Sequence, residues 1–169
     1  MQPRLSFVLV IMAVAACEHP AKPDPKPDPA RDAPAMAAPP VNSVNGPKVV
    51  ISSARGDIAV EVEVVSTEAR IERGLMYRQF LAPESGMLFL LGVEKDWPFW
   101  MRNTLIPLDM IFIRKSMTIA GIVENAEPKT ESMRTVGEPS LYVLEVNAGW
   151  TRSHGVIKDA KVRFANVGP

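Results

Sequence analysis

Residues 57–65 read DIAVEVEVV, and this alternation of branched apolar with polar or small side chains predicts a β-strand. One face of the strand would be apolar and the other wet; the apolar positions are Ile58, Val60, Val62 and Val64. A second β-branched run precedes it at residues 49–53, and Arg55 with Gly56 suits a tight turn between the two. The two runs therefore predict a hairpin.

Short apolar runs of the same kind continue towards the C-terminus. Further strands are predicted at residues 86–91, 99–104, 108–114, 118–124, 141–146 and 160–166. A short helix is expected after Ser66 or Thr67, ending at Gly74, and a helical turn within residues 147–154. Many short strands with one or two short helices predict a mainly β fold, a compact antiparallel sandwich or barrel-like domain.

Residues 1–17, MQPRLSFVLVIMAVAAC, have the features of a signal peptide: Arg4 as the charged start, an apolar stretch and small residues before a cleavage point. The stretch is shorter than the ~20 apolar residues of a membrane-spanning helix. Its end, VAAC, resembles the lipobox of bacterial lipoproteins, which implies cleavage before Cys17, the only cysteine, and lipidation of that residue. The alternative is an ordinary secretory signal with a chance cysteine.

Residues 18–47 hold most of the prolines and almost no large apolar side chain, so we expect a disordered tether. Its PKPDP repeats favour extended polyproline II, which would hold the following domain away from a membrane. Glu18 is not the aspartate that commonly retains lipoproteins in the inner membrane. The sequence therefore favours a lipid-anchored location in the bacterial cell envelope, at the outer membrane facing the periplasm rather than at the inner membrane.

Residues 48–169 have the size of one domain and carry equal numbers of basic and acidic residues. Domains that bind nucleic acid show a basic excess or stripe, so no nucleic-acid partner is expected. The partner that the sequence itself indicates is the membrane, through lipid on Cys17.

Four segments in this domain resemble, in order, the signature of the Domain of Unknown Function 192 family. They are IERGLMYR at residues 71–78, GMLF at 86–89, FWMRNTLIPLDMIFI at 99–113 and LEVNAGW at 144–150. The resemblance implies a compact, mostly β domain, frequently exported or membrane-attached in bacteria, with no established activity. The chain departs from the family near its end, where GVIKDAKVRF stands in place of a pattern like GIKVGDRV, so the final turn is expected to be rebuilt.

Asp109 follows Pro107 and lies within the apolar run of residues 108–113. An ionised carboxylate there is costly unless a cation or several hydrogen-bond donors compensate it. The favoured interpretation is a buried ion pair that fixes the register of the sheet, and the alternative is a ligand-binding role. The candidate ligand-binding residues are Arg73, Arg78, Trp100, Arg102, Asn103, Thr104 and Asp109, of which the three arginines are the candidate partners of Asp109 and Asn103 and Thr104 also suit a turn.

Glu145 lies in LYVLEVN, where it would share one face of a strand with Leu141 and Val143. If that face is inward, Glu145 is a second carboxylate beside Asp109, and the two with an arginine could serve acid–base catalysis on a sugar or cell-wall polymer. The same residues could form a structural network. Catalysis by Asp109 and Glu145 is the less favoured interpretation.

No metal or cofactor is predicted, because His19 and His154 stand apart from other potential ligands. Met76, Met87 and Met101 could form a thioether site for copper, but methionines more often fill the core, and packing is favoured.

The sequence therefore predicts a tethered envelope lipoprotein whose role is to bind a small molecule, a glycan or an envelope protein. The alternatives are a hydrolase using Asp109 and Glu145, and a structural or assembly factor. Geometry should separate them: two carboxylates lining one cleft would favour the hydrolase. A cleft lined by Trp100 and Arg102 would favour binding, and a flat surface would favour assembly.

Overall fold

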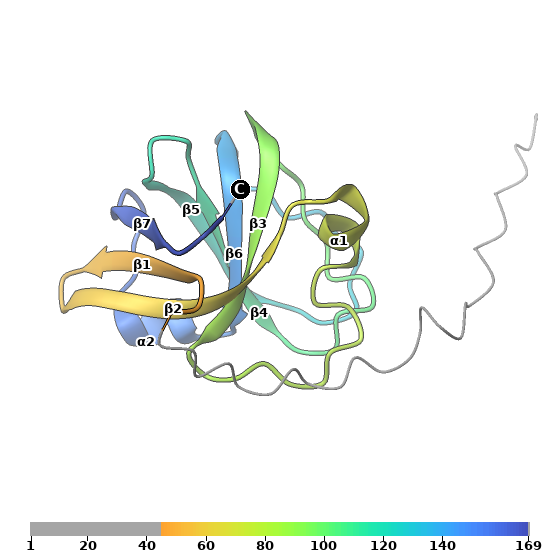
Figure 1. Ribbon diagram of the computed structural model, residues 1–169. Coiled ribbons are helices and arrows are strands. Elements are labelled where there is room, and N and C mark those ends of the chain that lie inside the picture. The colour runs from red at the N-terminus through yellow and green to blue at the C-terminus, as the bar shows by residue number, and fades with distance from the viewer. Residues whose placement is uncertain (1–44, 169) are drawn as a thin grey trace, which may run out of the picture. The chain divides into compact units, whose positions relative to one another are not determined.

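The computed structural model describes residues 45–168, which form a β-rich domain with two short helices (Figure 1). The strands are β1 (Lys48–Ser53), β2 (Gly56–Val65), β3 (Ser85–Lys95), β4 (Leu108–Ile113), β5 (Ile119–Ala126), β6 (Ser140–Asn147) and β7 (Val162–Ala165). The helices are α1 (Glu68–Arg73) and α2 (Trp150–His154). This confirms the predicted mainly β class with one or two short helices.

All seven strands belong to one sheet, in the order β5-β4-β6-β3-β2-β1-β7. The sheet curls until its two ends meet, since Val162 N donates to Met117 O at 2.9 Å and Ile119 N donates to Ala160 O at 3.0 Å. Pairing is antiparallel except between β2 and β3, which run parallel. The crossover that this parallel pair requires contains α1.

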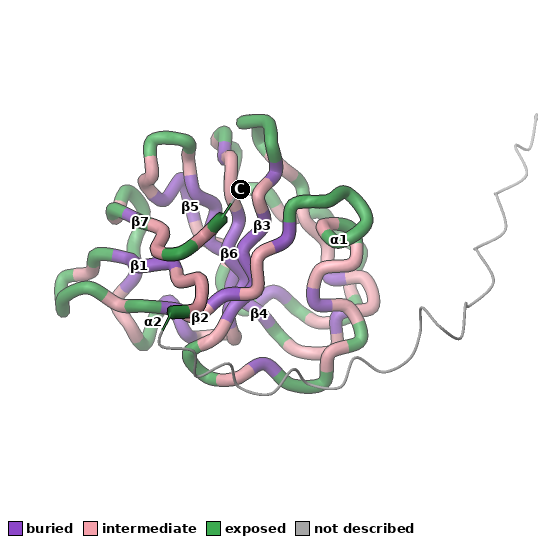
Figure 2. The backbone as a smooth tube through the Cα atoms, viewed as in Figure 1, coloured by how far each residue is buried: buried purple, intermediate pink, exposed green. Residues whose placement is uncertain are grey.

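Each central strand has two buried faces, so the domain has two apolar clusters. The inner face, inside the curl, carries Ile111 and Leu144 together with Trp150 of α2. The outer face carries Phe89, Phe112 and their neighbours. The most deeply buried positions run along β3, β4 and β6 (Figure 2). Burial on both faces explains why the sequence of β4 is almost continuously apolar, with Asp109 as its one polar residue.

Two segments cover the outer face: residues 74–84, which follow α1, and residues 96–107, which join β3 to β4. Figure 1 shows α1 on the opposite side of β3 from β1 and β7. The face of β2 that was predicted to be exposed to solvent is only partly exposed, because Val65 on that face is buried.

The strand predicted at residues 99–104 is wrong, because this stretch is a loop. Phe99 forms a single bridge with Arg134, and Met101 N donates to Thr130 O at 3.0 Å. The chain then turns, with Thr104 N donating to Met101 O and Asn103 in the left-handed region at φ +55°. Phe99 and Met101, at alternate positions of this loop, pack onto the outer face of the sheet. The alternation therefore reflects packing of a loop and does not require pairing with a neighbouring strand.

The predicted ends of α1 are confirmed, but the predicted side-chain cap is not formed. Thr67 precedes the helix without a side-chain hydrogen bond to it. Gly74 ends the helix at φ +46° and ψ −132°, outside the left-handed helical region, and a Cβ atom there would approach the ring of Phe89 to 3.3 Å. Both the backbone conformation and the close approach favour glycine. The final turn holds Asp159 at φ +65°, a left-handed position that aspartate tolerates.

The predicted signal peptide, the lipidation site Cys17 and most of the tether, up to residue 44, lie outside the described residues. Among residues 45–168, no helix is long and apolar enough to cross a membrane.

Candidate functional site

Asp109 is completely buried, and its carboxylate accepts four hydrogen bonds. Oδ1 accepts from the backbone N–H of Asn125 at 2.9 Å and of Gly149 at 3.1 Å. Oδ2 accepts from the backbone N–H of Thr151 at 3.0 Å and from its hydroxyl at 2.6 Å. The carboxylate thus joins β4 to the end of β5 and to the start of α2, which is a structural role.

The predicted partnership of Asp109 with an arginine is wrong. Within residues 45–168, the ion pairs do not include Asp109. Arg78 pairs with Glu63, and Arg102 Nε lies 3.9 Å from a carboxylate oxygen of Glu131. The negative charge of Asp109 is compensated instead by hydrogen-bond donors, most of them from the turn into α2. Several donors were the alternative to a cation for stabilising a buried carboxylate.

The strand register separates the two predicted carboxylates. In the antiparallel pair β4–β6, Asp109 lies opposite Val146, and Met110 lies opposite Glu145. Paired residues share a face and successive residues alternate, so Asp109 points to the inner face and Glu145 to the outer face. The structure does not bring the two carboxyl groups together across one substrate.

Glu145 is only 5% exposed, and no other described residue hydrogen-bonds to its carboxyl group. Burial without a compensating partner raises the pKa of Glu145 to about 8. The group is therefore mostly a neutral carboxylic acid at pH 7, with one donor and an acceptor that the domain itself does not use. Such a group on a covered face marks a candidate binding site.

Glu145 occupies the middle of a row that crosses four strands on the outer face. Glu63 of β2 lies opposite Met87 of β3, Met87 lies opposite Glu145, and Glu145 lies opposite Met110 of β4. We call these four residues the outer-face row. Met87 is 1% exposed and Met110 is fully buried. Glu145, a carboxylic acid without a hydrogen-bond partner among the described residues, thus lies between Met87 and Met110.

The segment after α1 passes over this row and is fixed on both sides of it. Arg78 donates to the carboxylate of Glu63 at one end of the row. Further along, the side-chain amide of Asn147, two residues after Glu145 on the same face, donates to the carbonyls of Leu81 and Ala82 at 3.0 and 3.1 Å. Arg78, a predicted ligand residue, therefore holds the cover in place.

The two cover segments also bind each other, at a strained point. Tyr77 N donates to Asn103 O at 2.8 Å, and both residues have positive φ, +63° and +55°. Asparagine tolerates this conformation, but for a bulky residue it is rare and costs about 1–3 kcal/mol. Strain of this kind is common at binding and catalytic sites, so Tyr77 is a further candidate residue, one that no sequence pattern indicates.

Aromatic side chains are exposed around this point. Tyr77 is 44% exposed and Phe80 is 62% exposed. Trp100 is half-buried, with the guanidinium of Arg102 at 5.6 Å from its ring centroid. We call Tyr77, Phe80, Trp100, Arg102 and Asn103 the paired-loop surface. It gathers three of the predicted ligand residues.

Thr104 and Arg73, the other two predicted ligand residues of this region, are not included in the paired-loop surface. Thr104 is buried, and its hydroxyl lies 3.5 Å from the carbonyl of Arg102 within the turn. Arg73 is half-buried at the end of α1.

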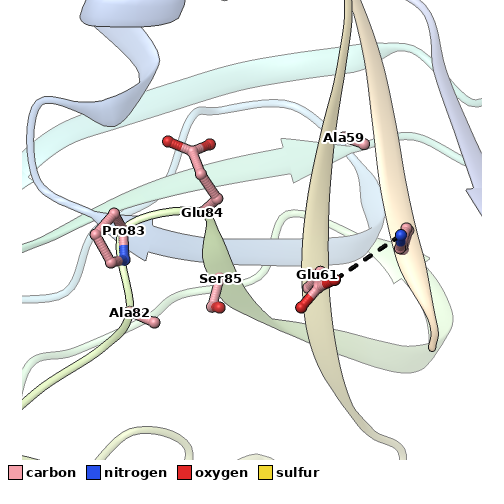
Figure 3. Close-up of a pocket in the computed structure, with 7 residues that line it drawn as sticks. Ala59, Glu61, Ala82, Pro83, Glu84 and Ser85 are labelled. Atoms are coloured by element: carbon pink, nitrogen blue, oxygen red, sulfur yellow. Dashed lines mark ion pairs between the residues drawn. The ribbon is translucent and has the colours of Figure 1, made fainter. Parts of the chain in front are cut away.

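A shallow hollow lies beyond the cover, lined by Lys48, Ala59, Glu61, Ala82, Pro83, Glu84 and Ser85 (Figure 3). Glu61 pairs with Lys48 at 3.8 Å. The carboxylate of Glu84 turns away from Glu61 and accepts from Trp150 Nε1 at 3.1 Å. Because its charged groups are already engaged within the domain, this hollow is a weaker candidate than the outer-face row.

The fold and these features define a small curled-sheet domain with a second, loop-covered core that contains a buried acid. Residues 50–164 match the model of the DUF192 family, described as "Uncharacterized ACR". The chain belongs to the DUF192 family.

Solved structures similar to this chain include the following two. A protein of Sinorhizobium meliloti 1021, described as a "putative transcription regulator", has 38% identity and a TM-score of 0.68, covering 73% of this chain and 97% of its own. A protein of unknown function from Novosphingobium aromaticivorans DSM 12444 has 34% identity and a TM-score of 0.68, covering 82% of this chain and 99% of its own. No curated protein matches the chain.

Proposed function

We propose that this protein is a lipid-anchored binding module of the bacterial cell envelope, and that its paired-loop surface holds a glycan. The lipobox-like VAAC at Cys17 and the proline-rich stretch after it support the location. The strained contact between Tyr77 and Asn103 carries the assignment of the surface, because it joins the two loops that carry the exposed aromatic residues.

A glycan suits the chemistry of this surface. A sugar ring has apolar faces and hydroxyl groups at its edges, and aromatic rings beside guanidinium and amide groups offer the complementary contacts. Tyr77 and Phe80 present aromatic area, and Arg102 and Asn103 present donors. A hydrolase using Asp109 and Glu145 is less well supported, since these carboxyl groups lie on opposite faces of the sheet.

Phe80→Ala is expected to weaken retention of the protein on purified peptidoglycan sacculi by roughly tenfold, because it removes an exposed ring without disturbing the core. Cosedimentation over a range of sacculus concentrations measures this. Ile157→Ala is the matched control, since Ile157 is similarly exposed, at 66%, and lies outside the paired-loop surface. Equal retention of both variants and the parent, or no retention of the parent, would contradict the proposal.

The anchor is tested separately. Cys17→Ala is expected to abolish incorporation of labelled palmitate in growing bacteria, because Cys17 is the only thiol available for acylation. Immunoprecipitation and autoradiography measure it. Labelling of the variant at the parent level would show that Cys17 is not the anchor.

A further inference from the structure

The outer-face row brings together side chains with the chemistry of a soft-metal site. Met87 and Met110 lie directly opposite Glu145 on the two strands that flank β6. Opposed residues on neighbouring antiparallel strands have Cα atoms about 4.5–5.5 Å apart. Both thioethers are therefore placed beside the carboxyl group, one from each side.

Met101 supplies a third thioether to the same buried cluster. It is fully buried, and the cluster contains Met87 and Met110 as well. Its backbone N–H donates to Thr130 O at 3.0 Å, which fixes this part of the loop against the following segment. Three sulfur atoms and one carboxyl group thus come from three strands and one loop. Met76, the other methionine considered for a thioether site, is half-exposed and outside the cluster.

Packing alone accounts for the methionines but not for Glu145. Methionine fills irregular gaps in a core, and three of them need no further reason. A carboxyl group buried among them without a hydrogen-bond partner in the described chain is different, because burying an unpaired polar group costs free energy. A bound cation would satisfy the carboxylate and the thioethers at the same time.

The donor set selects the type of cation. Thioethers are soft ligands that favour Cu(I), whereas calcium and magnesium require several oxygen ligands. Residues 45–168 contain no cluster of three or more His, Cys, Asp and Glu side chains of the kind that holds zinc. One carboxylate balances the charge of one monovalent cation.

We propose that Met87, Met101, Met110 and Glu145 form a binding site for Cu(I). The flexible methionine side chains can adjust around an ion without movement of the strands that carry them. The cover segment between Arg78 and Leu81 lies over the row, and the small exposed part of Glu145 gives the ion a first point of contact. This site lies beneath the paired-loop surface and does not depend on glycan binding.

Titration of the full chain with Ag(I), a redox-stable substitute for Cu(I), tests the proposal. All samples carry Cys17→Ala, because a free thiol would itself bind the ion. We expect the parent to bind a single Ag(I) tightly and to melt several degrees higher with the ion. Met87→Leu combined with Met110→Leu keeps the core volume and is expected to weaken binding roughly tenfold or more. Cu(I) competition with bicinchoninate under anaerobic conditions should give the same order of affinities.

Met133→Leu is the matched control, since Met133 is 59% exposed and lies outside the buried cluster, and it should bind like the parent. Glu145→Gln keeps the shape of the side chain and removes its charge, so it should also weaken binding. Should the parent fail to bind Ag(I), or should the double methionine variant bind it as the parent does while remaining folded, the site does not exist as described.

Discussion

Asp109→Asn is expected to destabilise the domain by about 3 kcal/mol, because the amide nitrogen it introduces cannot accept hydrogen bonds. Asp109 accepts from Asn125, Gly149 and Thr151 in a fully buried setting. An asparagine can satisfy the donors on one side of its amide, and those on the other side would face N–H groups. Buried donors without acceptors cost about 1–3 kcal/mol each.

Thermal or urea unfolding at pH 7 measures this loss, which corresponds to a fall of roughly 10 °C in melting temperature. Asp96→Asn is the matched control, since Asp96 is exposed and should tolerate the same chemical change. Thr151→Val should lose part of the same energy through its hydroxyl, and Thr151→Ser should retain it. An Asp109→Asn domain as stable as the parent would remove the structural role of this carboxylate.

Glu145→Gln is expected to have the opposite effect, stabilising the metal-free domain by roughly 4 kcal/mol at pH 8. Burial raises the folded-state pKa of Glu145 to about 8, whereas an unfolded glutamate titrates near pH 4.3. Between these values the folded state binds the additional proton, so the contribution of Glu145 to stability is greatest below about pH 4 and is lost as the pH rises towards 8. Glutamine does not titrate and escapes this loss.

Urea unfolding of the parent and the variant from pH 5 to pH 8 separates this effect from all other titrating groups, because the difference between the two proteins isolates residue 145. The difference should grow by roughly 3–4 kcal/mol over that range. Glu127→Gln, at an exposed position, should follow the parent throughout. A difference that stays constant with pH would mean that Glu145 is ionised in the folded domain.

Most of the strands could be predicted from the sequence because their signals are local. The alternation in β2, the turn at Gly56 and the glycine that ends α1 each depend on neighbouring residues alone. The loop at residues 99–104 was predicted as a strand because its apolar side chains also alternate. Its true form depends on hydrogen bonds to residues 130 and 134, which no local pattern contains.

The candidate site could be predicted only in part. The apolar surroundings of Asp109 correctly indicated a buried carboxylate, but its donor Thr151 lies 42 residues away in the chain. The sequence also placed Glu145 on one face of its strand. It could not show that Asp109 points to the opposite face, because that depends on the register between β4 and β6. The exposure of Tyr77 and Phe80 could not be predicted, because it depends on how the two segments that cover the outer face contact each other.

The protonation state of Glu145 is the most direct test of the outer-face site, since that site depends on an acid that is buried without a partner. In metal-free protein labelled with ¹³C at the glutamate side-chain carboxyl carbon, comparison with Glu145→Gln assigns the resonance of residue 145. We predict that this resonance keeps the chemical shift of a carboxylic acid through pH 7 and titrates with a pKa of about 8. Titration of this resonance below pH 5 would show that Glu145 is ionised in the folded domain at pH 7 and that the outer face holds no buried acid.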